Sequence, residues 1–359
     1  MPGTAAGRAR HQTIWCLARG ACLAPLSLLV PGSRSVPGTA FGSARSAVPP
    51  VGTVRTMRMR ELGSGGPTVS VVGLGTNNFG MRVDYDGTLA VIDAALEHGI
   101  TLFDTADIYG QGMSEDFIGR ALEGRRDRVL LATKFGKPMD ERPDDSRGSR
   151  DYIRWAVEGS LRRLRTDTID LYQMHEPDPS TPIETTLDAL HELVQEGLVR
   201  HIGSSNYSAT QIEEADRVAR ERGVTRFVAA QNHYSLVERD VEDDVLPVCE
   251  RLGIGVLPYF PLASGLLTGK YVRGEPATEG RLAGREVPAE RWDRFEARQR
   301  YADERGVPLL SVAIGGLAAM PAVASVIAGA TRPEQVEANV RAGTWEPTAA
   351  DLQALNALR

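Results

Sequence analysis

The sequence alternates short apolar runs with longer amphipathic stretches, and this alternation limits the possible folds more than any other feature. Eight runs are typical of buried strands: 70–75, 100–104, 129–134, 168–174, 199–204, 226–231, 254–259 and 324–328. The stretches between them are long enough for helices and carry apolar residues at helical spacing. Such an alternation builds a parallel sheet covered by helices. Eight units predict an α/β fold of the closed kind, a (β/α)8 TIM barrel, rather than an open doubly wound sheet.

Three helix starts carry the residues of a capping box. The motifs are Thr181 to Glu184, with Pro182 at the first helical position, Ser208 to Gln211, and Thr331 to Glu334. In this motif a Ser or Thr side chain accepts a hydrogen bond from an early backbone N–H, and a Glu or Gln side chain reaches back. We therefore predict a capped helix at each of these places.

Two segments do not fit the repeating units. Residues 57–72 have the pattern of an extra hairpin, which we expect to cap the floor of the barrel. Residues 263–292, after the seventh predicted strand, exceed the usual length of a loop between strand and helix. We expect this long loop to form a lid over the functional site.

The first 56 residues differ in composition from the rest. They are rich in Ala, Gly, Pro, Ser and Arg and contain no acidic residue before Glu61. No helical or strand periodicity is sustained there. We expect residues 1–56 to be disordered, or to be upstream sequence translated from an early start codon, with a targeting peptide as the alternative. Residues 57–359 form the predicted barrel domain.

Charge and cysteine content exclude several functions. The whole chain has a net charge of −6, and because the leading segment is basic, the barrel region is more acidic still, which argues against a nucleic-acid partner. No apolar run reaches the roughly 18 residues that a membrane span needs. The barrel region has one cysteine, Cys249, and no metal-ligand spacing. A reducing, cytoplasmic location is therefore favoured.

Four polar residues follow or end three consecutive predicted strands. Asp104 and Tyr109 come at and after the second strand, Lys134 ends the third, and His175 ends the fourth. Because the carboxyl ends of barrel strands meet at one rim, we expect these side chains to lie together. An ammonium lowers the pKa of a neighbouring phenol, and a carboxylate keeps that ammonium charged. The set can donate a proton to a carbonyl oxygen that gains charge, with the imidazole as an orienting hydrogen-bond donor.

Several motifs, in this order, resemble those of the aldo/keto reductase family. They are Gly73 to Thr76, Asp104 to Gly110, Thr133-Lys134, His175 to Asp178, Gly203 to Tyr207, Tyr259 to Leu262 and Gly329 to Gln335. The similarity is greatest to the branch with bacterial reductases and potassium-channel β subunits. It implies Tyr109 as proton donor and His175 as the residue that orients the substrate. Lys134 and Asp104 are then the residues that set the pKa of Tyr109.

The resemblance also implies a nicotinamide cofactor that lies extended across the rim. Ser205, Asn206 and Gln231 would bind its carboxamide, and Tyr259 would stack on its ring. Arg332, at a predicted helix start where backbone N–H groups favour anions, would bind a 2′-phosphate, so NADPH is favoured over NADH. Further cofactor-binding positions are Gly75, Thr76, Pro261, Leu262, Gly329, Thr331, Gln335 and Asn339. Ala338 stands where the family often has an acid, which weakens the predicted hold on adenine.

We therefore predict NADPH-dependent reduction of an aldehyde or ketone to an alcohol, on a small-molecule carbonyl substrate, with no metal, nucleic-acid or membrane partner. Two alternatives remain open. Lys134 could be the Schiff-base lysine of a barrel aldolase, although Asp104 nearby would keep it protonated. The chain could also be a redox-sensing binding module like the channel β subunits, which retain the same four residues. Substrate and oligomeric state are not readable from the sequence.

Overall fold

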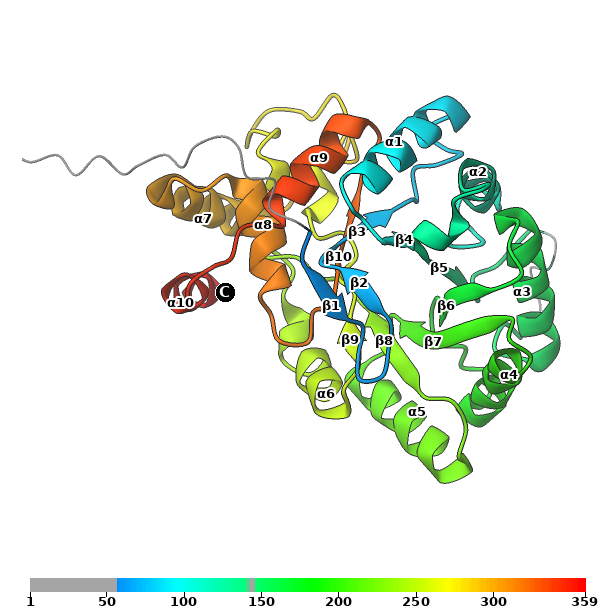
Figure 1. Cartoon of the computed structure of the whole chain (residues 1–359). Coiled ribbons are helices and arrows are strands. Elements are labelled where there is room, and N and C mark those ends of the chain that lie inside the picture. Colours follow the sequence, from blue (N-terminus) through cyan, green and yellow to red (C-terminus); the bar gives the residue numbers. More distant parts are fainter. Residues whose placement is uncertain (1–56, 141, 143–145) are drawn as a thin grey trace, which may run out of the picture. The chain divides into compact units, whose positions relative to one another are not determined.

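Eight parallel strands form the centre of the fold in this computed structural model, which describes residues 57–359 without 141 and 143–145 (Figure 1). The strands are β3 Val72–Gly75, β4 Leu102–Asp104, β5 Leu130–Phe135, β6 Ile169–Met174, β7 Val199–Ser205, β8 Phe227–Gln231, β9 Gly255–Val256 and β10 Val326–Gly329. Their order in the sheet is β10-β3-β4-β5-β6-β7-β8-β9. Each strand from β3 to β9 thus lies beside the next one along the chain. The predicted extension 1–56 lies outside the described residues.

Backbone hydrogen bonds join the two ends of this sheet. Val256 N–H donates to Ala322 O over 2.7 Å, and Ala324 N–H donates to Val256 O over 3.0 Å. Ile327 N–H, in β10, donates to Pro258 O over 3.2 Å. The chain that leads into β10 therefore lies against β9. Together with the parallel order, these bonds confirm the predicted (β/α)8 barrel.

Helices follow the strands and surround the barrel (Figure 1). They are α1 Tyr85–Glu97, α2 Met113–Ala121, α3 Arg150–Leu164, α4 Ile183–Gln195, α5 Ala209–Arg222, α6 Val245–Leu252, α7 Ala289–Arg305, α8 Leu309–Ala318, α9 Pro333–Ala342 and α10 Ala349–Ala357. α7 is additional to the repeating pattern, since it lies with α8 between β9 and β10. Among the described residues, no helix combines the length and the apolar character needed to cross a membrane.

One of the three predicted capping boxes is present. At the start of α5, Ser208 Oγ accepts a hydrogen bond from Gln211 N–H, and the Gln211 side chain accepts one from Ser208 N–H. The prediction for α4 was wrong in detail. Pro182 is the N-cap rather than the first helical residue, and Thr181 Oγ1 donates instead to Asp178 Oδ2 over 2.8 Å.

The prediction for α9 was also wrong in detail. Its N-cap is Arg332, without a side-chain cap, and Pro333 is the first helical residue. Gln335 Oε1 accepts from the N–H and the hydroxyl of Thr331, over 2.8 and 3.1 Å. The side chain that bonds back to Thr331 therefore belongs to Gln335, one residue after the expected Glu334. A proline after the N-cap fixes the backbone, so the start of α9 is set by Pro333 rather than by a box.

Strand edges differ from the predictions by a few residues. The strand expected at 254–259 is limited to Gly255–Val256 in β9. Pro258 has no N–H to donate to a neighbouring strand, which shortens the ladder there. The strand expected at 100–104 begins at Leu102.

The predicted hairpin is present before the first barrel strand, as β1 Met59–Glu61 and β2 Thr68–Ser70. Leu62 and Val69 are fully buried in one cluster with Leu102, Ala132, Leu171, Ala229, Leu257, Ala324 and Ile327. Most of these partners belong to barrel strands. Since the hairpin immediately precedes β3, its apolar side chains close the amino-terminal end of the barrel interior. A separate and larger apolar cluster packs the strands against the helices.

The long segment after β9 crosses the carboxyl end of the barrel. It begins with the 3-10 helix η3, Ala263–Thr268, and has no further helix or strand before α7. Arg281 donates to the side-chain oxygens of Asn77 and Asn78, in the loop after β3; the bond to Asn78 is 3.1 Å long. The segment thereby spans from the seventh barrel strand to the first. This position agrees with the expected lid.

Candidate active site

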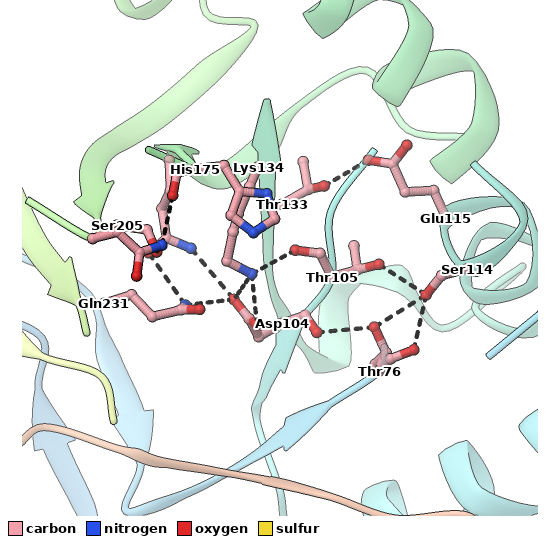
Figure 2. Close-up of polar contacts among 12 residues, drawn as sticks. Thr76, Asp104, Thr105, Ser114, Glu115, Thr133, Lys134, His175, Ser205 and Gln231 are labelled. Carbon is pink, nitrogen blue, oxygen red and sulfur yellow. Dashed lines mark hydrogen bonds and ion pairs between the residues drawn. The ribbon is translucent and has the colours of Figure 1, made fainter. Parts of the chain in front are cut away.

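A buried ion pair lies at the carboxyl ends of β4 and β5. Lys134 Nζ donates to both carboxylate oxygens of Asp104, over 2.8 and 2.7 Å, and to the backbone oxygen of Thr105 over 2.8 Å (Figure 2). An ammonium has three N–H donors, so this lysine is fully bonded. Burial opposes the charged form, but Asp104 and Tyr109 together raise the pKa of Lys134 above its ordinary value. Lys134 is therefore a permanent cation at neutral pH.

Tyr109 lies in the loop between β4 and α2, next to this pair. Lys134 Nζ is 5.3 Å from the centre of the Tyr109 ring. Desolvation raises the pKa of Tyr109 above its ordinary value, while Lys134 acts in the opposite direction. From the sequence we expect Lys134 to lower the pKa of Tyr109. The lysine does have that effect, but desolvation outweighs it, so the phenol keeps its proton through the neutral range.

His175 follows β6 and completes the group of four. Its ring packs edge to face against Tyr109, with ring centres 5.9 Å apart. Burial, together with the charges of Lys134 and Lys137, lowers the pKa of His175 to about 2. The imidazole is therefore neutral at physiological pH, and one of its nitrogens carries a proton that can be donated. The four residues come together as predicted from the strand ends.

A cavity of about 740 Å³ opens above these residues. Its wall includes Asp104, Tyr109 and His175, whereas Lys134 lies beneath it and is fully buried. All the predicted cofactor positions are in the same wall: Gly75, Thr76, Ser205, Asn206, Gln231, Tyr259, Pro261, Leu262, Gly329, Thr331, Arg332, Gln335 and Asn339. The volume is in the range of ordinary ligand sites. Many of these positions end barrel strands, which explains how residues distant in sequence share one cavity.

Amide side chains and an aromatic ring are hydrogen-bonded to one another beside these four residues. Tyr259 Oη donates to Asn206 Oδ1 over 2.8 Å, and Asn206 Nδ2 donates to the backbone oxygen of His175 over 2.8 Å. Asn206 has a left-handed backbone, with φ of 61°, which Asn tolerates better than most residues. Gln231 Nε2 donates to Asp104 Oδ1 over 2.8 Å, leaving its oxygen available to a ligand donor.

Gln173 is a member of this network that the sequence argument missed. It is fully buried on β6, and its Nε2 donates to Asp104 Oδ1 over 3.3 Å. Its own side-chain oxygen accepts from Gln231 Nε2 over 3.4 Å. Strand alternation could have identified Gln173, because alternate strand residues point inward and Gln173 is a polar residue at an inward position of a predicted strand.

Lys270 and Arg281 are also missed residues of the cavity wall. Both belong to the long segment after β9. No carboxylate among the described residues lies within ion-pair distance of either cation. Arg332, at the start of α9, lies in the same wall and has a 3.7 Å contact with Glu334. The wall thus combines amides and an aromatic ring with cations and a helix start.

Among the described residues, no group of three or more His, Cys, Asp or Glu side chains is arranged to hold a metal ion. The site is instead a polar barrel rim with a phenol, a neutral imidazole and a buried lysine–aspartate pair. In (β/α)8 barrels, catalytic residues come from this end of the strands.

Comparison with known proteins gives the class of this site. The aldo/keto reductase family model matches residues 71–359. The chain belongs to the aldo/keto reductase family and is an oxidoreductase, as the sequence resemblance implied.

Several relatives support this assignment. The chain is 38% identical over 304 residues to the Bacillus subtilis protein named uncharacterized oxidoreductase YrpG, covering 80% of this chain and 91% of that one. It is 34% identical to a probable voltage-gated potassium channel subunit beta of Arabidopsis thaliana, over 80% of this chain and 91% of that one. The holo structure of aldo-keto reductase AKR11C1 from Bacillus halodurans matches with a TM-score of 0.72 and 34% identity, covering 84% of this chain and 96% of that one.

Proposed function

We propose that the protein reduces an aldehyde or ketone of a small-molecule substrate to the alcohol, with NADPH as the reductant and Tyr109 as the proton donor. The observation that carries this proposal is the juxtaposition of Tyr109 and His175 in one cavity wall, directly above the Lys134–Asp104 pair. A carbonyl oxygen placed between the phenol and the imidazole would find two neutral hydrogen-bond donors.

Each of the four residues has a separate task. Tyr109 holds its proton at neutral pH and donates it to the carbonyl oxygen as that oxygen gains negative charge. Lys134 stabilises the phenolate that remains, because its ammonium stays charged. Asp104 keeps the ammonium charged and in place. His175 donates a hydrogen bond that orients the carbonyl and stabilises its developing charge.

The donor set around the cavity fits a nicotinamide dinucleotide. A bound nicotinamide supplies the hydride. Tyr259 presents an aromatic ring for stacking, and the free oxygen of Gln231 can accept from a carboxamide. Lys270 and Arg281 line the cavity without acidic partners, so they are suited to a pyrophosphate. The Arg332 guanidinium, together with the positive end of the α9 dipole, suits a 2′-phosphate, which favours NADPH over NADH.

The burial and the hydrogen bonds of Lys134 argue against the aldolase alternative. A Schiff-base lysine must be neutral and reach its substrate. Lys134 is fully buried, is absent from the cavity wall, and has all three donors engaged. We therefore infer that Lys134 acts through Tyr109 and forms no covalent bond with substrate.

The test follows NADPH absorbance with an activated aromatic aldehyde, comparing the protein with Tyr109→Phe. We expect steady oxidation of NADPH that falls about 10²- to 10⁴-fold in the variant, because a general acid is lost. Survival of the activity in Tyr109→Phe would remove the proton-donor assignment. NADPH binding with no turnover in either protein would favour the alternative of a redox-sensing binding module; the plant relatives are named as probable voltage-gated potassium channel subunits beta.

A further inference from the structure

A second polar cluster lies behind the catalytic group, at the start of α2. Residues 105–112 connect β4 to α2 and carry Tyr109; we call them the Tyr109 turn. Three consecutive residues in it have left-handed backbones: Gly110, Gln111 and Gly112, with φ of 60°, 53° and 91°. Gln111 is not a glycine, so this conformation is strained and needs support from its surroundings. Ser114 and Glu115, in the first turn of α2, attach this segment to residues at the ends of the barrel strands.

Ser114 provides the first attachment. It is fully buried, and its hydroxyl lies 2.9 Å from Thr105 Oγ1 and 3.1 Å from Thr76 Oγ1 (Figure 2). Thr76 in turn donates to the backbone oxygen of Asp104 over 2.9 Å. The hydroxyl cluster therefore joins the start of α2 to the ends of β3 and β4, so both ends of the Tyr109 turn are held.

Glu115 provides the second attachment, on the strand that carries Lys134. It is fully buried, and its Oε1 accepts from Thr133 Oγ1 over 2.6 Å (Figure 2). Successive strand residues point to opposite faces, so Thr133 points outward to the helices while Lys134 points inward. Glu115 thus holds β5 from its outer face, one residue away from the catalytic lysine.

Arg163, on α3, connects Glu115 to the Tyr109 turn itself. Its Nε donates to Glu115 Oε2 over 2.7 Å. A Cβ atom added at Gly112 would lie 2.6 Å from Arg163 Cδ, so the turn is in close contact with this side chain. Glycine at 112 is required both by the left-handed backbone and by this approach.

The cluster holds two carboxyl groups and one guanidinium. Asp107 is buried in the Tyr109 turn, and burial together with the charge of Glu115 raises the pKa of Asp107 well above its ordinary value, which favours its neutral form. The carboxylate of Glu115 is paired with the guanidinium of Arg163. Glu115 is absent from the cavity wall, so it has no contact with a ligand there.

We propose that Glu115 is a positioning residue for the reaction, which holds the Tyr109 turn against β5 and thereby keeps the Tyr109 hydroxyl beside Lys134. This inference rests on the proposed function, since it takes Tyr109 as the proton donor. The groups that face Tyr109 come from several elements: Asp104 from β4, Lys134 from β5, His175 after β6, and Tyr259 and Arg281 after β9. Glu115 touches none of these except through Thr133 and the turn.

The experiment compares Glu115→Gln with the parent protein in steady-state carbonyl reduction by NADPH between about pH 7 and pH 11.5, a range that extends above the ordinary pKa of a phenol. Glutamine keeps the shape of the side chain but has no charge and only one acceptor oxygen, so the charge-assisted bond from Arg163 and the acceptance from the Thr133 hydroxyl cannot both be retained. We expect kcat to fall about 10- to 100-fold, since small displacements of a catalytic group have effects of this order. We also expect unchanged NADPH affinity, measured by fluorescence titration.

The pH profile separates positioning from a general loss of stability. Lys134 lowers the pKa of Tyr109, so a phenol displaced from Lys134 keeps its proton to higher pH. Tyr109 must be protonated for activity, so kcat falls as pH rises through the pKa of Tyr109. In Glu115→Gln we expect this fall to occur at a higher pH than in the parent protein. Thr133→Val removes one attachment with little change of shape, and we expect a smaller change in the same direction. It also keeps the proposal testable if Glu115→Gln fails to fold.

Two controls give every outcome a meaning. Asp170→Asn breaks another buried carboxylate–arginine cluster, at the other end of the barrel, and should leave kcat and its pH profile unchanged. Equal losses of kcat in Asp170→Asn and Glu115→Gln would overturn the positioning role. So would a folded Glu115→Gln or Thr133→Val with the kcat and profile of the parent. Tyr109→Phe in the same assay identifies the other failure: if it stays active, the proton-donor assignment fails and the positioning role fails with it.

Discussion

At the carboxyl end of the barrel Asp104 pairs with Lys134, whereas near the amino end Asp170 pairs with Arg126 and Arg200. Both carboxylates are buried, with side chains 4% and 6% exposed. Their partners differ: the Lys134 side chain is 1% exposed, but those of Arg126 and Arg200 are 25% and 64% exposed. The amino-end cations keep contact with water, so that cluster has a low desolvation cost. The carboxyl-end pair is almost completely removed from water.

This difference separates a structural ion cluster from a functional one. Asp170 also accepts from Leu131 N–H over 2.9 Å, so it joins three strands or loops near the hairpin-covered end. Asp104 and Lys134 lie instead under an open cavity, next to a phenol. A fully desolvated pair contributes little net stability compared with apolar residues. The proposed proton transfer from Tyr109 would account for its presence at the cavity.

A substitution of Lys134 is the strongest test of the difference between the two ion clusters. We expect Lys134→Met to destabilise the protein by about 3–5 kcal/mol, because it leaves the Asp104 charge buried without its cation. Carbonyl reduction should also be lost. Urea unfolding at pH 7 measures the first effect. In the double variant Asp104→Asn, Lys134→Met, most of the stability should return but not the activity; if activity returned too, the pair would not be functional.

His175 tests the desolvation at the carboxyl end through the pH dependence of the unfolding free energy. Its pKa is about 2 in the folded protein, far below that of the unfolded chain, so the unfolded state binds more protons as pH falls below the ordinary value. The stability from neutral His175 is thus present above about pH 6.5 and is lost toward acid, at up to about 1.4 kcal/mol per pH unit. In His175→Asn the difference between unfolding free energies at pH 6.5 and pH 5 should shrink by about 1.6 kcal/mol.

A substitution of Asp170 tests the ion cluster at the amino end, where we expect a smaller effect. Asp170→Asn removes charge-assisted hydrogen bonds but leaves arginines that water can solvate. We expect a loss of about 1–2 kcal/mol in the unfolding free energy and an unchanged kcat. A large fall in kcat would show that the amino end is coupled to the chemistry.

The smallest expected effect concerns Arg332, which lies at the periphery of the cavity and is well exposed. Arg332→Ala should reduce the preference for NADPH over NADH about tenfold, through loss of a charged hydrogen bond to the 2′-phosphate. The ratio of kcat/KM for the two cofactors measures it. Carbonyl reduction with NADH should be unaffected, and an equal fall with both cofactors would contradict the assignment.

Much of the fold could be predicted because the relevant signals are local. The period of apolar residues and the residues at helix starts gave all eight strands and the cap of α5. The capping boxes predicted at Thr181 and Thr331 do not form, because each threonine hydroxyl donates to another partner, Asp178 and Gln335, that only the folded loop brings near. Lys270 and Arg281 were missed because the path of an irregular segment has no periodicity to reveal it.

The sequence by itself determined the strand ends, and therefore that Asp104, Tyr109, Lys134 and His175 share one rim. That follows from alternation and parallel order alone, since parallel strands end at the same edge. Only the tertiary structure decided how these groups behave. The raised pKa of Tyr109, the neutral His175 and the hold of Glu115 on β5 depend on distance and desolvation. These quantities arise when segments far apart in the chain exclude water together, and no local pattern encodes them.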